Sequence, residues 1–227
     1  MLFRSESAFV VVSGTGERVR VGKILAFGRN YADHNAEMGH AQPVPPVLFL
    51  KPPTAIVHDG GVVTLPVGMG SVHHEIELVV AIGRSGRAIP ETAALDHVLG
   101  YAVGLDLTLR DLQMEAKSKG DPWALAKGFD GSAPVSTIVP KERAGDPAAL
   151  ALTLDVNGAR RQEGSTARML LGVAALVAYA SRWITLERGD LLFTGTPSGV
   201  GPIVGGDRIV ARLGELASVS VTIAEAP

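Results

Sequence analysis

The sequence predicts a single α+β domain that is rich in β-structure, and three observations support this fold class. The chain has 227 residues, of which 46% are hydrophobic and 19% charged, which is enough to form a large core. Its 27 glycines and 14 prolines suit many turns between short strands better than a helical bundle. Short apolar runs bounded by turn residues recur along the chain and predict strands. We expect residues 1–227 to form one domain, with residues 1–20 as a short N-terminal β lead-in.

The composition also excludes several classes of protein. The formal net charge is -2 and no basic stripe is present, so neither a nucleic-acid partner nor a membrane surface is expected. Cysteine is absent, which excludes disulfides and thiolate metal sites and is consistent with a reducing compartment. No apolar run reaches the length of a membrane span, and residues 1–6 lack the apolar core of a signal peptide. We therefore expect a cytoplasmic protein.

The first candidate site residues follow two short predicted strands, at residues 8–12 and 23–27. Residues 28–39 begin and end with glycine and are expected to contain one or two helical turns. His34 and Glu37 are three residues apart, so on a helix they share a face and can hydrogen-bond to each other. A carboxylate beside an imidazole raises the pKa of the imidazole and fixes its tautomer, as a general base requires. The alternative is an ordinary surface pair.

Lys51 ends the apolar run of residues 47–50, in a segment kept extended by prolines at residues 43–53. A lysine in this position either ends a strand at the surface or points into a cleft. The surface arrangement is the commoner one, and nothing in the local sequence favours the other.

Residues 72–80 are the stretch around which the chain is organised, and their alternation predicts one strand. Glu75 and Glu77 are two residues apart and therefore share a face of that strand. Two adjacent carboxylates repel each other unless a cation offsets them, and Mg2+, Mn2+ and Ca2+ prefer such oxygen ligands. The alternative is a solvated acidic edge of a sheet.

The next segment supplies a possible third carboxylate. Residues 90–99 predict a helix with proline in its first turn and Gly100 as its cap. Residues 101–108 then form an apolar stretch interrupted by Asp106, which is costly to bury unless it is paired or binds a metal. The alternative is an aspartate at a strand end that accepts backbone hydrogen bonds. Arg110 and Gln113 follow, three residues apart, and can face the same site.

Lys127 lies between small and apolar residues and precedes a glycine, which lets the backbone approach closely. A lysine held in such a place can stabilise a developing enolate or bind a carboxylate. The alternative is a surface lysine whose aliphatic chain lies along the protein.

The C-terminal part predicts a hairpin at Asn157-Gly158 and a helix over residues 169–183, capped by Ser165 or Thr166. A loop of glycines and hydroxyl residues follows at residues 195–201. Its backbone N–H groups and Thr196 can bind a substrate carboxylate. The spacings of dinucleotide-binding and P-loop motifs are absent.

Taken together and in this order, these motifs resemble the fumarylacetoacetate hydrolase superfamily over nearly the whole chain. The motifs that carry the resemblance are Gly28-Arg29-Asn30-Tyr31 with His34 and Glu37, Glu75-x-Glu77, Asp106 with Arg110 and Gln113, Lys127-Gly128-Phe129-Asp130, and Gly195-Thr196-Pro197-Ser198-Gly199-Val200-Gly201. Within the superfamily the chain resembles the short single-domain members that act as acylpyruvases and oxaloacetate decarboxylases.

The resemblance implies a mixed β-roll or sandwich, a homodimer, and Mg2+ or Mn2+ held by Glu75, Glu77 and Asp106. It implies that His34 and Glu37 lie on a lid and activate water, that Lys127 stabilises an enolate, and that the substrate is bound by Arg29, Arg110, Gln113 and Thr196. The expected activity is hydrolysis of a C–C bond in acylpyruvates or fumarylpyruvate. Oxaloacetate decarboxylation, 2-oxo acid isomerisation or hydration, and a catalytically inactive metal-dependent binding module are the alternatives.

Overall fold

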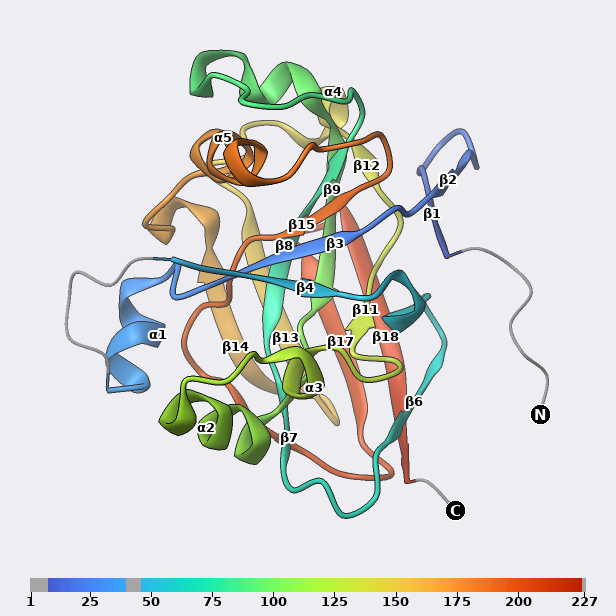
Figure 1. Ribbon diagram of the computed structural model, residues 1–227. Coiled ribbons are helices and arrows are strands. Elements are labelled where there is room, and N and C mark those ends of the chain that lie inside the picture. The colour runs from blue at the N-terminus through green and yellow to red at the C-terminus, as the bar shows by residue number, and fades with distance from the viewer. Residues whose placement is uncertain (1–7, 40–45, 226–227) are drawn as a thin grey trace.

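Two β-sheets, of six and five strands, form the centre of the computed structural model, which describes residues 8–39 and 46–225 (Figure 1). In spatial order, the six-stranded sheet consists of β12 (Val139–Pro140), β9 (Val98–Leu105), β8 (Ile76–Ile82), β15 (Leu191–Phe193), β3 (Ile24–Gly28) and β4 (Val47–Lys51). The five-stranded sheet consists of β14 (Ala159–Ser165), β13 (Ala151–Val156), β17 (Arg208–Leu213), β18 (Ala217–Glu225) and β6 (Val62–Leu65). The pairs β15–β3 and β18–β6 are parallel and the other neighbours antiparallel, so both sheets are mixed.

Shorter elements surround these sheets. The small sheets are formed by β10 (Thr108–Leu109), β7 (Val72–His74) and β16 (Gly201–Ile203), by β1 (Phe9–Val11) and β2 (Arg18–Arg20), and by β11 (Ala133–Pro134) and β5 (Ile56–Val57). The helices are α1 (Ala32–Glu37), α2 (Arg110–Lys119), α3 (Ala124–Lys127), α4 (Lys141–Ala144) and α5 (Val173–Trp183), with 3-10 turns η1 (Pro53–Ala55), η2 (Glu91–His97) and η3 (Thr166–Arg168). The described helices include none that is long and apolar enough to cross a membrane.

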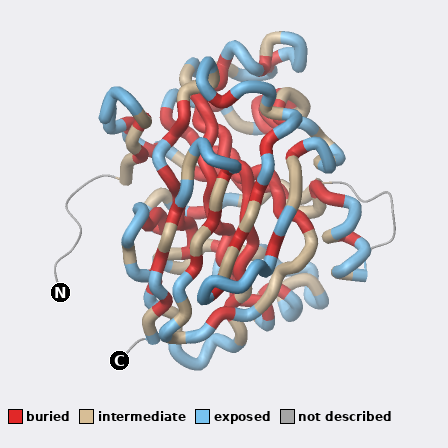
Figure 2. Tube along the Cα trace, turned by 180° about the vertical axis from the view of Figure 1, so that it is seen from behind, coloured by how far each residue is buried: buried red, intermediate tan, exposed pale blue. Residues whose placement is uncertain are grey.

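The six-stranded sheet is buried on both faces, which explains the continuous apolar run of β8 (Figure 2). Leu78, Val80 and Ile82 face the larger hydrophobic cluster, which also contains residues of the five-stranded sheet and of α5. Val79 and Ala81 face the smaller cluster, with residues of β1 and β2. β8 therefore fixes the position of Glu75, which directly precedes it.

The strand predicted over residues 72–80 is interrupted at Glu75. β7 pairs with β10 and β16, whereas β8 pairs with β9 and β15, so the chain passes from one sheet to another at this residue. The backbone groups at the break have other partners: the Glu75 carbonyl accepts from Asp106 N–H at 2.9 Å, and Ile76 N–H donates to Gln162 Oε1 at 3.0 Å. The sequence pattern detects the apolar alternation but not the change of partner strands.

Two predicted helices differ from the structure. Residues 91–97 form a 3-10 turn rather than an α-helix, and Gly100 lies inside β9 instead of capping a helix, because the chain enters the six-stranded sheet at Val98. The helix predicted from residue 169 begins at Val173. The hydroxyl of Ser165 accepts from Ala167 N–H and caps the preceding 3-10 turn instead.

Other local predictions are confirmed. Asn157 and Gly158 both have positive φ, 52° and 80°, and connect β13 to β14 as a hairpin. Residues 32–37 form the short helix expected after the second strand. The first seven residues of the predicted β lead-in and residues 43–45 of the proline-rich segment lie outside the described residues.

Candidate active site

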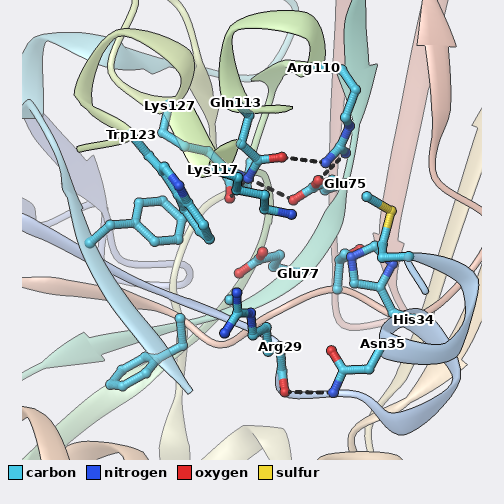
Figure 3. Close-up of a pocket in the computed structure, with 16 residues that line it drawn as sticks. Arg29, His34, Asn35, Glu75, Glu77, Arg110, Gln113, Lys117, Trp123 and Lys127 are labelled. Atoms are coloured by element: carbon cyan, nitrogen blue, oxygen red, sulfur yellow. Dashed lines mark hydrogen bonds and ion pairs between the residues drawn. The ribbon is translucent and has the colours of Figure 1, made fainter. Parts of the chain in front are cut away.

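The predicted site residues meet in one pocket between α1, α2, α3 and the end of the six-stranded sheet (Figure 3). Of the ten residues predicted from the sequence, nine line this pocket: Arg29, His34, Glu75, Glu77, Asp106, Arg110, Gln113, Lys127 and Thr196. Glu37 lies behind His34 and contacts it. The tertiary fold therefore brings together motifs from the whole length of the chain.

The three predicted metal ligands form a buried cluster. Glu75 lies at the break between β7 and β8, Glu77 on β8, and Asp106 directly after β9. Oxygens of all three carboxylates lie within 4.8 Å of one another. Because β8 and β9 are antiparallel neighbours, the start of β8 and the end of β9 lie side by side at the same end of the sheet. This adjacency makes a common ligand possible.

Three cations face the carboxylates. Lys127 Nζ lies 2.8 Å from Glu75 Oε2 and 2.5 Å from Asp106 Oδ2, and Arg110 pairs with Glu75 Oε1. Lys51 Nζ lies 2.8 Å from Asp106 Oδ1. Burial lowers the pKa of Lys127, but Asp106 and Glu75 outweigh this effect and raise its pKa above the usual value. Burial raises the pKa of Glu75, but Lys127 and Arg110 outweigh it and hold that pKa well below the usual range.

Lys127 and Lys51 are both buried. The surface position that is commoner for lysines with such local sequences is therefore wrong for both. Gly128 is needed beside Lys127, because a Cβ there would lie 2.7 Å from the carbonyl oxygen of Ala124. Lys51 ends β4 and donates to the carbonyl oxygens of Lys127 and Ser132, which ties β4 to the segment after α3. Sequence reasoning missed Lys51 as a site residue, since its partners are distant along the chain.

Two observations indicate that the carboxylate cluster fits an oxygen-ligated divalent cation. Asp106 Oδ1 is buried and accepts no hydrogen bond from the described residues, although Lys51 lies close to it. Among the described residues, the carboxylate of Glu77 accepts one hydrogen bond, from Gly195 N–H at 2.7 Å. Burial and the neighbouring Asp106 raise the pKa of Glu77 well above its usual value. A hard cation would bind carboxylate oxygens of this kind and would favour the charged form of Glu77.

His34 and Glu37 form the hydrogen-bonded pair expected from their spacing. His34 Nδ1 lies 3.1 Å from Glu37 Oε2, and the Glu37 carboxylate also accepts from Gly199 N–H at 3.1 Å. Since a carboxylate only accepts, Nδ1 carries the proton and Nε2 of a neutral His34 is free to accept one. His34 lines the pocket, whereas Glu37 is anchored outside it. This is the arrangement that a general base requires.

Arg29 occupies a strained position at the pocket wall. Its φ of 68° lies in the left-handed region, which costs a non-glycine residue about 1–3 kcal/mol. Its carbonyl oxygen accepts from Asn35 Nδ2 at 3.0 Å, which holds the turn. The buried Arg29 Nε has no hydrogen-bond partner among the described residues. The Arg29 side chain lines the pocket and forms no ion pair with a carboxylate of the described residues (Figure 3).

The loop after β15 differs in one respect from the prediction. The N–H groups of Gly195 and Gly199 bind Glu77 and Glu37, so these two are committed to side chains of the site instead of a substrate carboxylate. Gly195 has a φ of 96°, and a Cβ there would lie 2.9 Å from Asn30 Cβ. Thr196 is buried, and it lines the pocket.

Gln162 on β14 holds this loop against the metal-ligand strand. Its Oε1 accepts from Ile76 N–H at 3.0 Å and from His74 Nδ1 at 2.9 Å, and its Nε2 donates to Pro197 O and Thr196 Oγ1, both at 2.9 Å. The orientation of the amide is fixed, because a backbone N–H can only donate and a carbonyl oxygen can only accept. Thr196 Oγ1 therefore receives a hydrogen bond from Gln162 and donates its own proton to the carbonyl oxygen of Pro197 at 3.4 Å.

Replacing Gln162 with methionine should destabilise the protein by about 2–4 kcal/mol, because the buried Ile76 N–H and Pro197 carbonyl would lose their partner. Urea unfolding would measure this change. Glu163→Gln on the same strand is the matched control, because that side chain is exposed, and it should change stability by less than about 0.5 kcal/mol. Equal stability of Gln162→Met and wild type would contradict the proposed importance of this amide.

Besides Lys51, sequence reasoning missed several residues that line the pocket. Phe27, Phe49 and Trp123 contribute aromatic surface, Met38 and Asn35 come from α1 and the residue after it, and Lys117 from α2. The rings of Phe49 and Trp123 pack at a centroid distance of 5.7 Å. Of these residues, only Lys117 could have been predicted from the local sequence, because its helical spacing places it on the same face as Gln113 and Arg110.

Comparison with known proteins supports the resemblance noted in the motifs. A model of the fumarylacetoacetate (FAA) hydrolase C-terminal family matches residues 23–224. The chain is 52% identical over 196 residues to mouse mitochondrial oxaloacetate tautomerase FAHD1, covering 86% of this chain and 89% of the relative. It is 50% identical over 200 residues to the human protein of that name, covering 88% and 90%.

Solved structures agree on the fold. A crystal structure of fumarylpyruvate hydrolase from Pseudomonas aeruginosa, in complex with Mn2+ and pyruvate, matches with a TM-score of 0.94 and 40% identity over 100% of both chains. A fumarylpyruvate hydrolase-like structure from Burkholderia cenocepacia matches with a TM-score of 0.90 and 44% identity, covering 100% of this chain and 99% of that one. The mixed, β-rich α+β fold expected from the sequence is confirmed.

Proposed function

Because the chain belongs to the fumarylacetoacetate hydrolase family, we propose that it is a Mg2+- or Mn2+-dependent enzyme that hydrolyses a C–C bond in acylpyruvate-type 1,3-diketo acids. One observation carries this proposal. The His34–Glu37 pair, which is suited to activate water, opens onto the same pocket as the buried cluster of Glu75, Glu77 and Asp106. The manganese and pyruvate in the Pseudomonas aeruginosa hydrolase structure also support it.

Each group has a role that follows from its surroundings. A cation held by Glu75, Glu77 and Asp106 would act as a Lewis acid and as a template for the 2-oxo acid. Lys127 places a buried ammonium beside these carboxylates, where it can stabilise the negative charge that develops on an enolate oxygen. His34, oriented by Glu37, takes a proton from the water that attacks the distal carbonyl. Arg29, Arg110, Gln113 and Thr196 bind and orient the substrate.

A second candidate is tautomerisation or decarboxylation of oxaloacetate. It is favoured by the 50–52% identity to proteins named oxaloacetate tautomerase. Both reactions require the same stabilisation of an enolate, but neither consumes water. An inactive metal-dependent binding module is disfavoured by the oriented His34–Glu37 pair, and a turnover assay with acetylpyruvate would distinguish such a module from an enzyme.

Glu37→Gln should separate the two reactions at this site. It should lower the hydrolysis of acetylpyruvate by about 10²-fold, because His34 loses the carboxylate that orients it and supports its positive charge. Tautomerisation and decarboxylation of oxaloacetate should change much less. Both rates would be followed by absorbance at fixed Mg2+, with Lys127→Met as a comparison variant that lowers both.

Equal losses in Glu37→Gln would contradict a role in activating water. The pair would then serve a step that both reactions share, such as closure of α1 over the substrate. A wild-type protein that converts oxaloacetate but not acetylpyruvate would favour the second candidate.

We further propose a homodimer, as the family resemblance implies, and light scattering in solution would test it. The expected cytoplasmic location stays a prediction, because the mouse and human relatives are named as mitochondrial proteins.

A further inference from the structure

The pocket contains two kinds of cation. Lys127 and Arg110 in its lining, and Lys51 behind Asp106, each lie within ion-pair distance of Glu75 or Asp106, so the three carboxylates at the floor face three cations. Lys117 and Arg29 line the same pocket but form no ion pair with any carboxylate in residues 8–39 and 46–225. The floor is balanced in charge, whereas these two side chains carry charge that the described protein does not neutralise.

Lys117 and Arg29 reach the pocket from different elements and converge there. Lys117 lies on α2, one turn after Gln113, and Arg29 follows β3. Figure 3 shows the side chains of Lys117 and Arg29 extending toward Glu77 from opposite sides. Lys117 Nζ lies 5.4 Å from the centre of the Trp123 ring, within the range of a cation–π contact, which holds its aliphatic chain along the pocket wall. Both residues are only partly exposed.

Their surroundings favour the binding of an anion. Burial lowers the pKa of Lys117, and the nearby positive charges of Arg110 and Arg29 lower it further. An anion placed between Lys117 and Arg29 would relieve this repulsion. The guanidinium of Arg29 offers a planar pair of donors that matches a carboxylate, and the ammonium of Lys117 offers a point charge.

We propose that Lys117 and Arg29 form a second carboxylate subsite, which selects 2-oxo acids with a carboxylate at each end over acylpyruvates with only one. The proposal rests on the proposed function, in which the pyruvyl end of the substrate binds at the floor. The other end of an extended substrate then lies between Lys117 and Arg29, against the Phe49 and Trp123 rings. A neutral acyl end uses the aromatic surface alone.

The experiment compares two substrates in the metal-loaded enzyme. Fumarylpyruvate carries two carboxylates and acetylpyruvate carries one. Lys117→Gln leaves a polar side chain that is one atom shorter and removes its charge, so it should lower kcat/KM for fumarylpyruvate about tenfold, mainly through KM. The value for acetylpyruvate should stay within about twofold, since its acyl end has no charge. Lys117→Glu should lower the fumarylpyruvate value further and reverse the preference between the substrates.

Lys119→Gln is the matched control. It removes the same charge from the same helix, but Lys119 is exposed and pairs with Glu115 at 2.5 Å, so both substrates should behave as with wild type. Equal losses for the two substrates in Lys117→Gln would overturn the subsite, as would an effect of the same size in Lys119→Gln.

The subsite and the proposed function can fail separately. An active wild type whose preference is unchanged in Lys117→Gln overturns the subsite alone. A wild type that converts neither substrate overturns the proposed hydrolysis, and calorimetry with oxaloacetate and pyruvate then tests the subsite. The wild type should bind oxaloacetate at least about tenfold more tightly than pyruvate, and Lys117→Gln should remove this difference. Equal affinities of the wild type for oxaloacetate and pyruvate would overturn the subsite.

Discussion

Replacing Asp106 with asparagine should abolish metal-dependent turnover and also destabilise the metal-free protein. The amide keeps the shape of the side chain but is a poor ligand, and the loss of several kcal/mol of Lewis-acid catalysis corresponds to about 10³-fold or more in rate. Asp106 is also the carboxylate that lies 2.8 Å from the buried ammonium of Lys51. Leaving that charge without a carboxylate should cost about 3 kcal/mol of stability.

Glu77→Gln should be compared with Asp106→Asn. Glu77 has one hydrogen bond, to Gly195 N–H, and no ion pair with a described cation, while two other carboxylates lie nearby. Its loss should weaken metal binding as strongly as the loss of Asp106, but should leave the metal-free protein at least as stable as wild type. Titration calorimetry with Mn2+ and urea unfolding in chelator would measure the two effects.

The outcomes separate metal binding from charge balance in the apoprotein. Full activity of the wild type in chelator would refute the metal site. Equal destabilisation by Asp106→Asn and Glu77→Gln would refute the charge balance described for the floor of the pocket.

Replacing His34 with alanine should lower the rate of hydrolysis by about 10²–10⁴-fold, the usual contribution of a general base. The reason is geometric: Glu37 holds the proton on Nδ1, which leaves Nε2 to accept a proton from water in the pocket. Metal affinity should hardly change, because neither His34 nor Glu37 belongs to the carboxylate cluster.

Three measurements would check this role: kcat with acetylpyruvate, Mn2+ affinity by calorimetry, and recovery of activity when imidazole is added to His34→Ala. Added imidazole should restore part of the rate, since it supplies the missing base in the space that the side chain vacated. A large loss of metal affinity would show instead that His34 contributes to metal binding, and an unchanged rate would exclude it as the base.

Much of the site could be predicted because its residues occur in short local patterns. His34 with Glu37, Glu75 with Glu77, and Arg110 with Gln113 each lie within three residues of one another, and local geometry determines that each pair can act together. The apolar runs around them predicted β3, β8 and β9, and the Asn157-Gly158 turn predicted the hairpin of β13 and β14. The order of the motifs indicated the family.

Other features depend on contacts between distant parts of the chain. The strand pattern of residues 72–80 did not reveal the break at Glu75, because that break results from a change of partner strands. Lys51 and Lys127 each have a local sequence typical of a surface lysine. Both are buried because the pairing of β4 in the sheet and the position of α3 bring them to Asp106.

The sequence by itself determined the fold class, the family and the chemical types in the site, because these depend on residue identity and short spacing. Only the tertiary structure decided which charges neutralise one another. It paired Lys51, Lys127 and Arg110 with the carboxylates and left Arg29 and Lys117 without such partners among the described residues. The physical reason is that electrostatic energy depends on distance in space and on burial, and neither is determined by separation along the chain.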